Sequence, residues 1–121
     1  MFNFLALVML LVSYSDFITY DQAWKEHQKN QAPVITIITS DSCPHCVTMK
    51  KTLLEIKKEY PDFILAEISY QEAKKRFKLK SSSIPQTFMY AFDKEEEKIK
   101  TFKLVIGSTN KENLYKIWEM K

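Results

Sequence analysis

The chain has 121 residues, of which 45% are hydrophobic and 27% are charged, with one glycine and four prolines. This composition is typical of a single globular domain and excludes disordered and fibrous proteins. The net charge of +3 comes from 18 basic and 15 acidic residues that are interspersed, so we expect no nucleic-acid partner.

The first 15 residues form an apolar leader, in which residues 2–12 read FNFLALVMLLV and no charged side chain precedes Asp16. This length fits the hydrophobic region of a signal peptide and is shorter than the ~20 residues of a membrane span. Ser13 and Ser15 are the small residues expected before a cleavage site, although no Lys or Arg precedes the run. We therefore expect a leader over 1–15, either a signal peptide or an uncleaved anchor, and an exported protein. A cytoplasmic protein with a buried N-terminal segment is the alternative.

Beyond the leader, the hydrophobic pattern predicts one domain over 16–121 that begins with a possible strand at Phe17. Residues 19–30 are typical of a short amphipathic surface helix, in which we place His27 in solvent. The β-branched run VITIITS at 34–40 predicts a strand covered on both faces. A longer helix should then run to about Glu59, because Pro61 follows. Its predicted inward side chains are Met49, Leu53, Ile56 and Tyr60, with Val47 and Leu54 beside them, and its lysines at 50, 51, 57 and 58 should face away.

The second half of the chain predicts a strand at 62–68, a helical segment at 70–79 and an aromatic-rich strand leading to Phe92. An antiparallel partner strand should follow at 99–107, broken by Gly107. A closing helix begins after Thr109 or Asn110, and we expect it to turn Leu114, Ile117 and Trp118 inward. Alternating elements followed by a hairpin indicate an α/β fold, with a central mixed β-sheet flanked by helices on both faces.

The only two cysteines lie in SDSCPHCVTMK at 40–50, between a predicted strand and a predicted helix. The Cys43 sulfur should lie at the helix N-terminus, where unpaired N–H groups and the helix dipole favour a thiolate. In Cys-X-X-Cys motifs this placement lowers a thiol pKa from about 8.5 to between about 3.5 and 7.5, so Cys43 is the predicted nucleophile. Cys46 follows one turn later, within reach of a disulfide, and is the predicted resolving thiol.

Two neighbours should tune this pair. Pro44 suits the first helical position, where its missing N–H would have had no intrahelical partner. His45 adds cationic character or a hydrogen bond near the Cys43 sulfur. Stabilising the thiolate stabilises the dithiol over the disulfide and raises the reduction potential, which favours disulfide donation.

Other interpretations of the pair are a structural zinc site, two inert buried thiols and a purely structural disulfide. Zinc needs four ligands, and beyond the cysteines the chain offers only His45 and the distant His27, so we predict no metal. Inert thiols are expected in a core strand or helix face and not beside polar residues such as Asp41. A disulfide that closes so short a loop adds little stability. The sequence also contains no phosphate-binding loop, and we predict no cofactor.

The chain resembles the thioredoxin superfamily from about Phe17 to Met120. The resemblance rests on the strand that ends in SDSCPHC, the helix after it, the later FKLKSSSIPQTF and the tail VIGSTNKENLYKIW. It implies a thioredoxin fold in which Pro85 is a cis-proline facing the cysteines, while Ile84 offers its backbone to an extended peptide or a thiol substrate. The Pro44-His45 dipeptide is similar to that of periplasmic disulfide oxidants.

Two departures from the thioredoxin pattern bear on function. Ile37 occupies the position where thioredoxins bury an acid beneath the cysteines, so the proton shuttle for Cys46 is either missing or supplied by water or another group. Ser42 replaces the tryptophan that forms an aromatic wall of the substrate groove.

From the residues and the resemblance together we predict a monomeric thiol-disulfide oxidoreductase. It would exchange its Cys43–Cys46 dithiol or disulfide with protein thiols, protein disulfides or glutathione. The alternative is a binding module that uses the same fold to hold a partner protein, with incidental redox activity. The direction of electron flow and the redox partner, a reductase or an oxidase, depend on the compartment. A membrane is involved only through an uncleaved leader.

Overall fold

The computed structural model describes residues 17–79, 81–93, 98–101 and 103–120. The predicted leader at 1–15 lies outside these residues. Within them, none of the helices combines the length and the apolar character that crossing a membrane requires. The strands are β1 (Phe17–Thr19), β2 (Val34–Thr39), β3 (Ile64–Ser69), β4 (Gln86–Asp93), β5 (Lys98–Thr101) and β6 (Val105–Ile106). The helices are α2 (Tyr20–Asn30), α3 (Pro44–Glu59), α4 (Tyr70–Arg76) and α5 (Lys111–Ile117).

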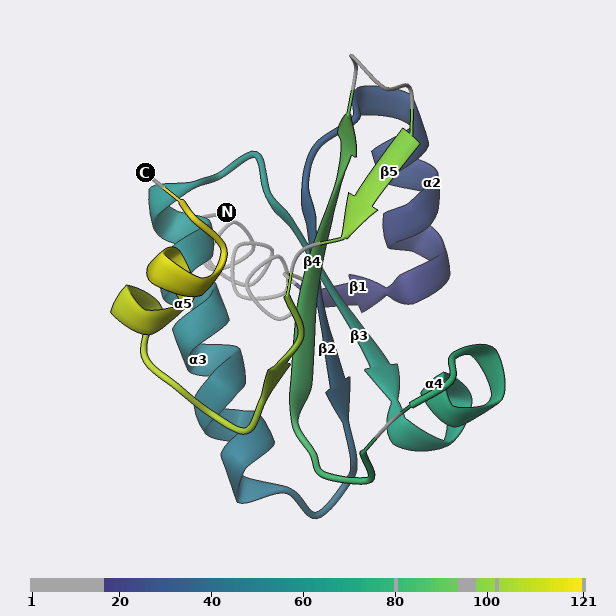
Figure 1. Ribbon diagram of the computed structural model, residues 1–121, viewed down its shortest axis with the longest axis vertical. Coiled ribbons are helices and arrows are strands. Elements are labelled where there is room, and N and C mark those ends of the chain that lie inside the picture. Colours follow the sequence, from purple (N-terminus) through teal and green to yellow (C-terminus); the bar gives the residue numbers. More distant parts are fainter. Residues whose placement is uncertain (1–16, 80, 94–97, 102, 121) are drawn as a thin grey trace, which may run out of the picture.

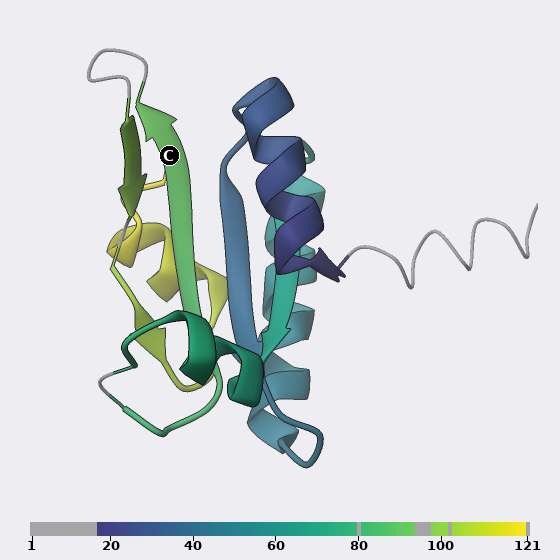
Figure 2. The ribbon, with the colours of Figure 1, turned by 90° about the vertical axis from the view of Figure 1, so that its right-hand side faces the viewer.

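The strands form one mixed sheet in the order β1-β3-β2-β4-β5, and β6 also pairs with β4. Strand β3 runs parallel to both β1 and β2, whereas β4 runs antiparallel to β2, β5 and β6. Helices α3 and α5 cover one face of the sheet, and α2 and α4 cover the other (Figures 1 and 2). This arrangement confirms the predicted α/β fold with helices on both faces.

Strand β2 lies at the centre of the sheet because both of its faces are apolar. Its first five residues are buried, as the β-branched run predicts. Ile35 and Ile37 point to the α3 face, where they pack with Met49 and Leu53, and Val34 points to the α2 face. The carboxyl end of this strand leads the chain to Cys43.

Helix α3 confirms most of the predicted stripe, since Met49, Leu53 and Ile56 are buried. Val47 was expected beside that stripe, but 56% of its surface is exposed, because it lies on the first turn of α3, beside Cys46. Two lysines expected to face away also make contacts, since Lys50 pairs with Glu67 and Lys57 donates to the carbonyls of Pro61 and Phe63.

The prediction that His27 lies in solvent is wrong, because only 2% of its surface is exposed. Its Nδ1 lies 2.7 Å from the Ala32 carbonyl oxygen, and its ring packs against Trp24 and edge-on against Tyr90. One hydrogen bond therefore joins the last turn of α2 to the segment that enters β2.

The single partner strand predicted at 99–107 is instead two short strands, β5 and β6, which both pair with β4. Between these two strands, the Lys103 carbonyl accepts a hydrogen bond from the Trp118 indole N–H at 2.9 Å. This carbonyl is therefore bonded to the residue that ends α5 and not to a neighbouring strand. Helix α4 is shorter than predicted, because it ends at Arg76. In α5, Leu114 and Trp118 are buried as predicted, but Ile117 is 36% exposed.

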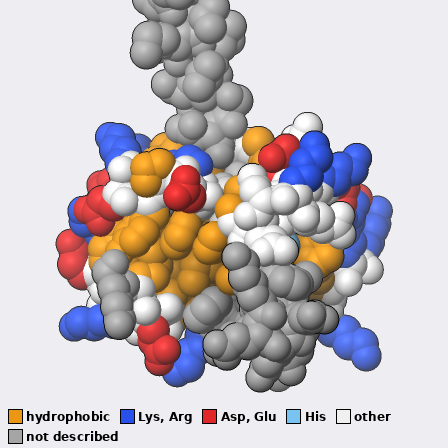
Figure 3. Space-filling model, turned by 90° about the horizontal axis from the view of Figure 1, so that it is seen from above, with side chains coloured by type: hydrophobic (Ala, Val, Ile, Leu, Met, Phe, Trp, Pro, Cys, Tyr) orange, Lys and Arg blue, Asp and Glu red, His pale blue; other side chains and the backbone are white. Residues whose placement is uncertain are grey.

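Hydrophobic side chains gather on the surface at the end of the molecule away from the start of α3 (Figure 3). At the C-terminal end of α3, Tyr60 stacks on Phe63 with ring centroids 5.2 Å apart and meets Tyr115 edge-on. The cysteines lie at the opposite end of the molecule, where α3 begins.

Candidate functional site

The cysteines lie where β2 gives way to α3. Cys43 is the N-cap of α3, with the extended backbone angles of a cap (φ −131°, ψ 95°), and Pro44 occupies the first turn. The Cys43 sulfur accepts a hydrogen bond from the Cys46 backbone N–H at 3.1 Å. The two cysteines are joined by a disulfide, with their Cα atoms 5.2 Å apart.

The two sulfurs differ in their access to solvent. Cys46 is 3% exposed and turned toward the core, whereas Cys43 is partly exposed at the surface. Pro44, His45 and Val47 are exposed around the pair. An incoming thiol or disulfide can therefore reach Cys43 but not Cys46.

The segment before β4 lies at the same end of the sheet. Ile38, near the end of β2, pairs with Gln86 at the start of β4, so residue 85 lies beside the strand that leads to Cys43. The Ile84–Pro85 peptide bond is cis. The Pro85 carbonyl accepts a hydrogen bond from the Gly107 N–H at 2.8 Å, and Gly107 has a positive φ of 89°, which glycine adopts without strain.

Gln86 is a site residue that sequence reasoning missed. Its side chain is fully buried, and its amide nitrogen donates to the carbonyls of Ser81 (2.9 Å) and Ser83 (2.7 Å). These bonds fix the loop that carries Ile84. The only signal in the sequence was a polar residue at the start of an otherwise apolar strand.

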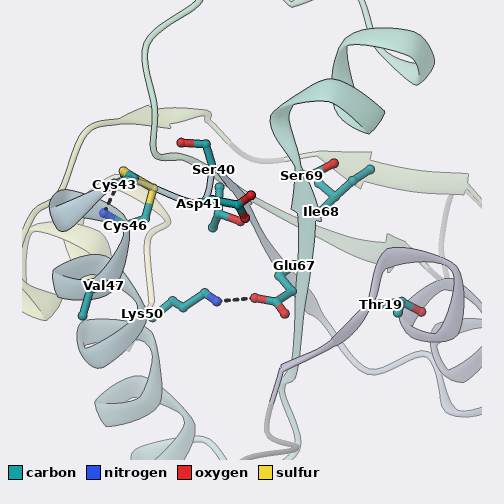
Figure 4. Close-up of a pocket in the computed structure, with 11 residues that line it drawn as sticks. Thr19, Ser40, Asp41, Cys43, Cys46, Val47, Lys50, Glu67, Ile68 and Ser69 are labelled. Atoms are coloured by element: carbon teal, nitrogen blue, oxygen red, sulfur yellow. Dashed lines mark hydrogen bonds and ion pairs between the residues drawn. A yellow bond between two sulfur atoms is a disulfide. The ribbon is translucent and has the colours of Figure 1, made fainter.

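A cavity of about 480 Å³ with polar and apolar walls opens beside the disulfide (Figure 4). Lys50 reaches across it from α3 to form an ion pair with Glu67 on β3. The cavity is lined by Thr19, Thr39, Ser40, Asp41, Cys43, Cys46, Val47, Lys50, Glu67, Ile68 and Ser69. It therefore joins both cysteines to a carboxylate and an ammonium group that the sequence analysis did not connect with them.

The cysteine pair, the Ile84–Pro85 segment and the charged cavity thus meet at one end of the sheet. Within the described residues, no group of three or more His, Cys, Asp or Glu side chains is arranged to hold a metal ion. His45 lies on the first turn of α3, and His27 lies in the distant α2.

Comparison with known proteins places the chain in a family. The model of a family described as thioredoxin-like matches residues 15–92. The chain belongs to the thioredoxin-like family. No curated protein sequence matches this thioredoxin-like chain.

Solved structures share the fold of this thioredoxin-like chain. A thioredoxin from Thermus thermophilus has a TM-score of 0.66 at 18% identity, covering 85% of this chain and 83% of that one. Trichomonas vaginalis thioredoxin has a TM-score of 0.64 at 17% identity, covering 88% and 98%. Trxlp from Edwardsiella tarda has a TM-score of 0.60 at 19% identity, covering 84% and 95%. The predicted thioredoxin fold is therefore confirmed.

A thioredoxin-like fold with a cysteine pair in Cys-X-X-Cys spacing supports thiol-disulfide exchange as the chemistry of this site. This combination of fold and cysteine pair does not favour the alternative of a partner-binding module with incidental redox activity.

Proposed function

We propose that the protein is an enzyme in which Cys43 exchanges disulfides with protein thiols, protein disulfides or glutathione, and Cys46 resolves the mixed disulfide. The observation that carries this proposal is the unequal exposure of two bonded sulfurs at one helix N-terminus. The reduced protein would attack a substrate disulfide through the Cys43 thiolate and release one substrate thiolate. Cys46 would then attack the Cys43 sulfur, closing the internal disulfide and releasing the second thiolate.

The roles of the surrounding residues follow from their positions. Ile84 is partly exposed beside the buried Pro85, at the end of the sheet that carries Cys43. Its backbone would pair with an extended peptide, and Ile106, 52% exposed and paired with Gln86, would add apolar contact. Pro44 would fix the first turn of α3, and His45 would stabilise the Cys43 thiolate.

Trapping tests the division of roles between the cysteines. A Cys46→Ala variant keeps the nucleophile and lacks the resolving thiol, so it should accumulate mixed disulfides through Cys43. The matched Cys43→Ala variant should accumulate none, because Cys46 is buried. Equal trapping by both variants, or by neither, would contradict the proposal.

A further inference from the structure

In the resolving step, Cys46 must lose its thiol proton. In the mixed disulfide Cys46 carries a thiol proton, but only its thiolate is a nucleophile. A cysteine thiol has an ordinary pKa of about 8.5, and burial disfavours the thiolate. Because Cys46 is only 3% exposed, its proton needs an acceptor within the protein or a water path to one.

Ile37, at the position where thioredoxins bury an acid, cannot be this acceptor because its side chain has no group that takes up a proton. Ile37 is fully buried and packs with Met49 and Leu53 on the α3 face. In the parallel ladder Ile37 is the partner of Glu67, and Glu67 lies two residues after Leu65, which belongs to the same core cluster as Ile37. Side chains alternate along a strand, so Glu67 points to the same face as Ile37, one strand away.

The cavity connects this carboxylate to Cys46. The titratable side chains that line it with the cysteines are Asp41 from the loop before α3, Lys50 from α3 and Glu67 from β3 (Figure 4). Lys50 pairs with Glu67, and its Nζ lies 5.4 Å from the centre of the Phe17 ring. The side chains of Lys50 and Glu67 are 34% and 40% exposed. The ion pair therefore holds a carboxylate in a cavity that is large enough for water and lined in part by polar side chains. Asp41, in contrast, lies on an exposed loop.

We propose that Glu67, positioned by Lys50, is the proton acceptor for Cys46, acting through water in this cavity. As Cys46 attacks the Cys43 sulfur, its proton passes to the Glu67 carboxylate, the Cys43–Cys46 bond forms, and the bond from Cys43 to the substrate sulfur breaks. The leaving thiolate carries away the electron pair. In the opposite direction, protonated Glu67 returns the proton as Cys46 is released. This assignment rests on the proposed redox function.

The test separates attack from resolution. Reduced protein is mixed with oxidised glutathione as the probe, samples are quenched with acid, and mass spectrometry follows the mixed disulfide at Cys43 as it forms and decays between pH 5 and 9. Glu67→Gln keeps the shape and removes the acceptor. We expect resolution about 10²-fold slower at neutral pH, rising with pH toward the unmodified rate, while mixed-disulfide formation is nearly unchanged.

Control variants give the assignment its specificity. Glu59→Gln removes the carboxylate of another ion pair, with Lys111, at the far end of α3, and should leave both steps unchanged. Glu67→Asp should recover much of the rate that Glu67→Gln loses. Thermal unfolding checks that each variant is folded. If Glu67→Gln is not folded, Lys50→Met replaces it in the measurement. Lys50→Met removes the ion-pair partner of the Glu67 carboxylate and should alter the pH profile of resolution without altering that of mixed-disulfide formation.

Several results would overturn the assignment. One is an unchanged resolution profile in Glu67→Gln, or an unchanged profile in Lys50→Met where that variant replaces it. Another is slow resolution of the mixed disulfide in an Asp41→Asn variant while Glu67→Gln resolves at the unmodified rate. If the unmodified protein forms no mixed disulfide with glutathione or with protein disulfides, the proposed function itself fails, and the assignment with it.

Discussion

The Cys43 sulfur accepts a hydrogen bond from the Cys46 backbone N–H at 3.1 Å, so the proposed nucleophile also caps the helix that carries its partner. In the reduced protein this N–H and the helix dipole should stabilise the thiolate. We predict that the Cys43 thiol pKa in a Cys46→Ala variant lies well below the ordinary cysteine value. The rate of alkylation by iodoacetamide across pH measures it. A value near the ordinary cysteine value of about 8.5 would contradict this prediction.

His45 should make the disulfide a stronger oxidant. Replacing His45 by Ala removes a group proposed to favour the thiolate, so the reduction potential of the pair should fall, by about 30 mV for each unit of thiolate pKa lost. Equilibration with glutathione redox buffers measures the potential. Lys51→Ala, an exposed change on the same helix, should have a smaller effect. If the two variants shift the potential equally, His45 has no specific role.

Gln86 should control the loop before β4. Gln86→Leu removes both hydrogen bonds to the Ser81 and Ser83 carbonyls while keeping a buried side chain of similar size. We expect unfolding in urea to show a loss of about 1–3 kcal/mol. Exchange with a peptide disulfide should slow, while alkylation of Cys43 by iodoacetamide stays unchanged. Equal slowing of both reactions would locate the effect at the cysteine instead of the loop.

His27 should contribute to stability. His27→Ala removes a buried ring and its hydrogen bond to Ala32, which should lower the free energy of unfolding by about 2–4 kcal/mol. The exposed neighbour Gln28 provides the control, and Gln28→Ala should stay within about 0.5 kcal/mol of the original protein. Similar values for both variants in urea unfolding would contradict the buried placement of His27.

The pair between Asp21 and Arg76 should make stability depend on pH. Two hydrogen bonds, of 2.6 and 3.0 Å, join these residues of α2 and α4, and those from Arg76 hold the pKa of Asp21 below its usual value. A lowered carboxyl pKa stabilises the fold above the unfolded pKa of about 3.9, and the effect is lost as the pH falls through the folded value.

Asp21→Asn should therefore be less stable than the original protein at neutral pH, with the difference shrinking in acid. Thermal unfolding between pH 2 and 7 tests this, and Glu26→Gln on the same helix is the control. A difference between the two proteins that is constant across this range would show that the ion pair is not its cause.

Local patterns predicted the parts of the fold that depend on neighbouring residues. The β-branched run of β2, the apolar spacing of α3 and the cap at Asn110 each act within one element. The errors occur where distant residues meet. His27 is buried because its ring packs against Tyr90 and its Nδ1 lies within hydrogen-bond distance of the Ala32 carbonyl. The predicted single strand is interrupted where the Lys103 carbonyl accepts a hydrogen bond from Trp118.

The same distinction applies to the site. The cysteines and Pro44 could be placed from the motif, since a strand followed by a helix fixes them. Lys50 and Glu67 lie on different elements, and each one taken alone is an ordinary surface charge. Only the register of β2 with β3 brings Glu67 beside Ile37, in the half of each strand that leads to its carboxyl end.

The order of the strands has a consequence for synthesis of the chain. Strand β3 follows β2 along the chain, whereas the other edge of β2 can be paired only after β4, which begins at Gln86, has been synthesised. Until then an aliphatic strand has a row of unpaired backbone groups, the kind of edge on which chains aggregate. Fragments that end before β4 should be poorly soluble, so the C-terminal half of the protein should also protect the N-terminal half from self-association.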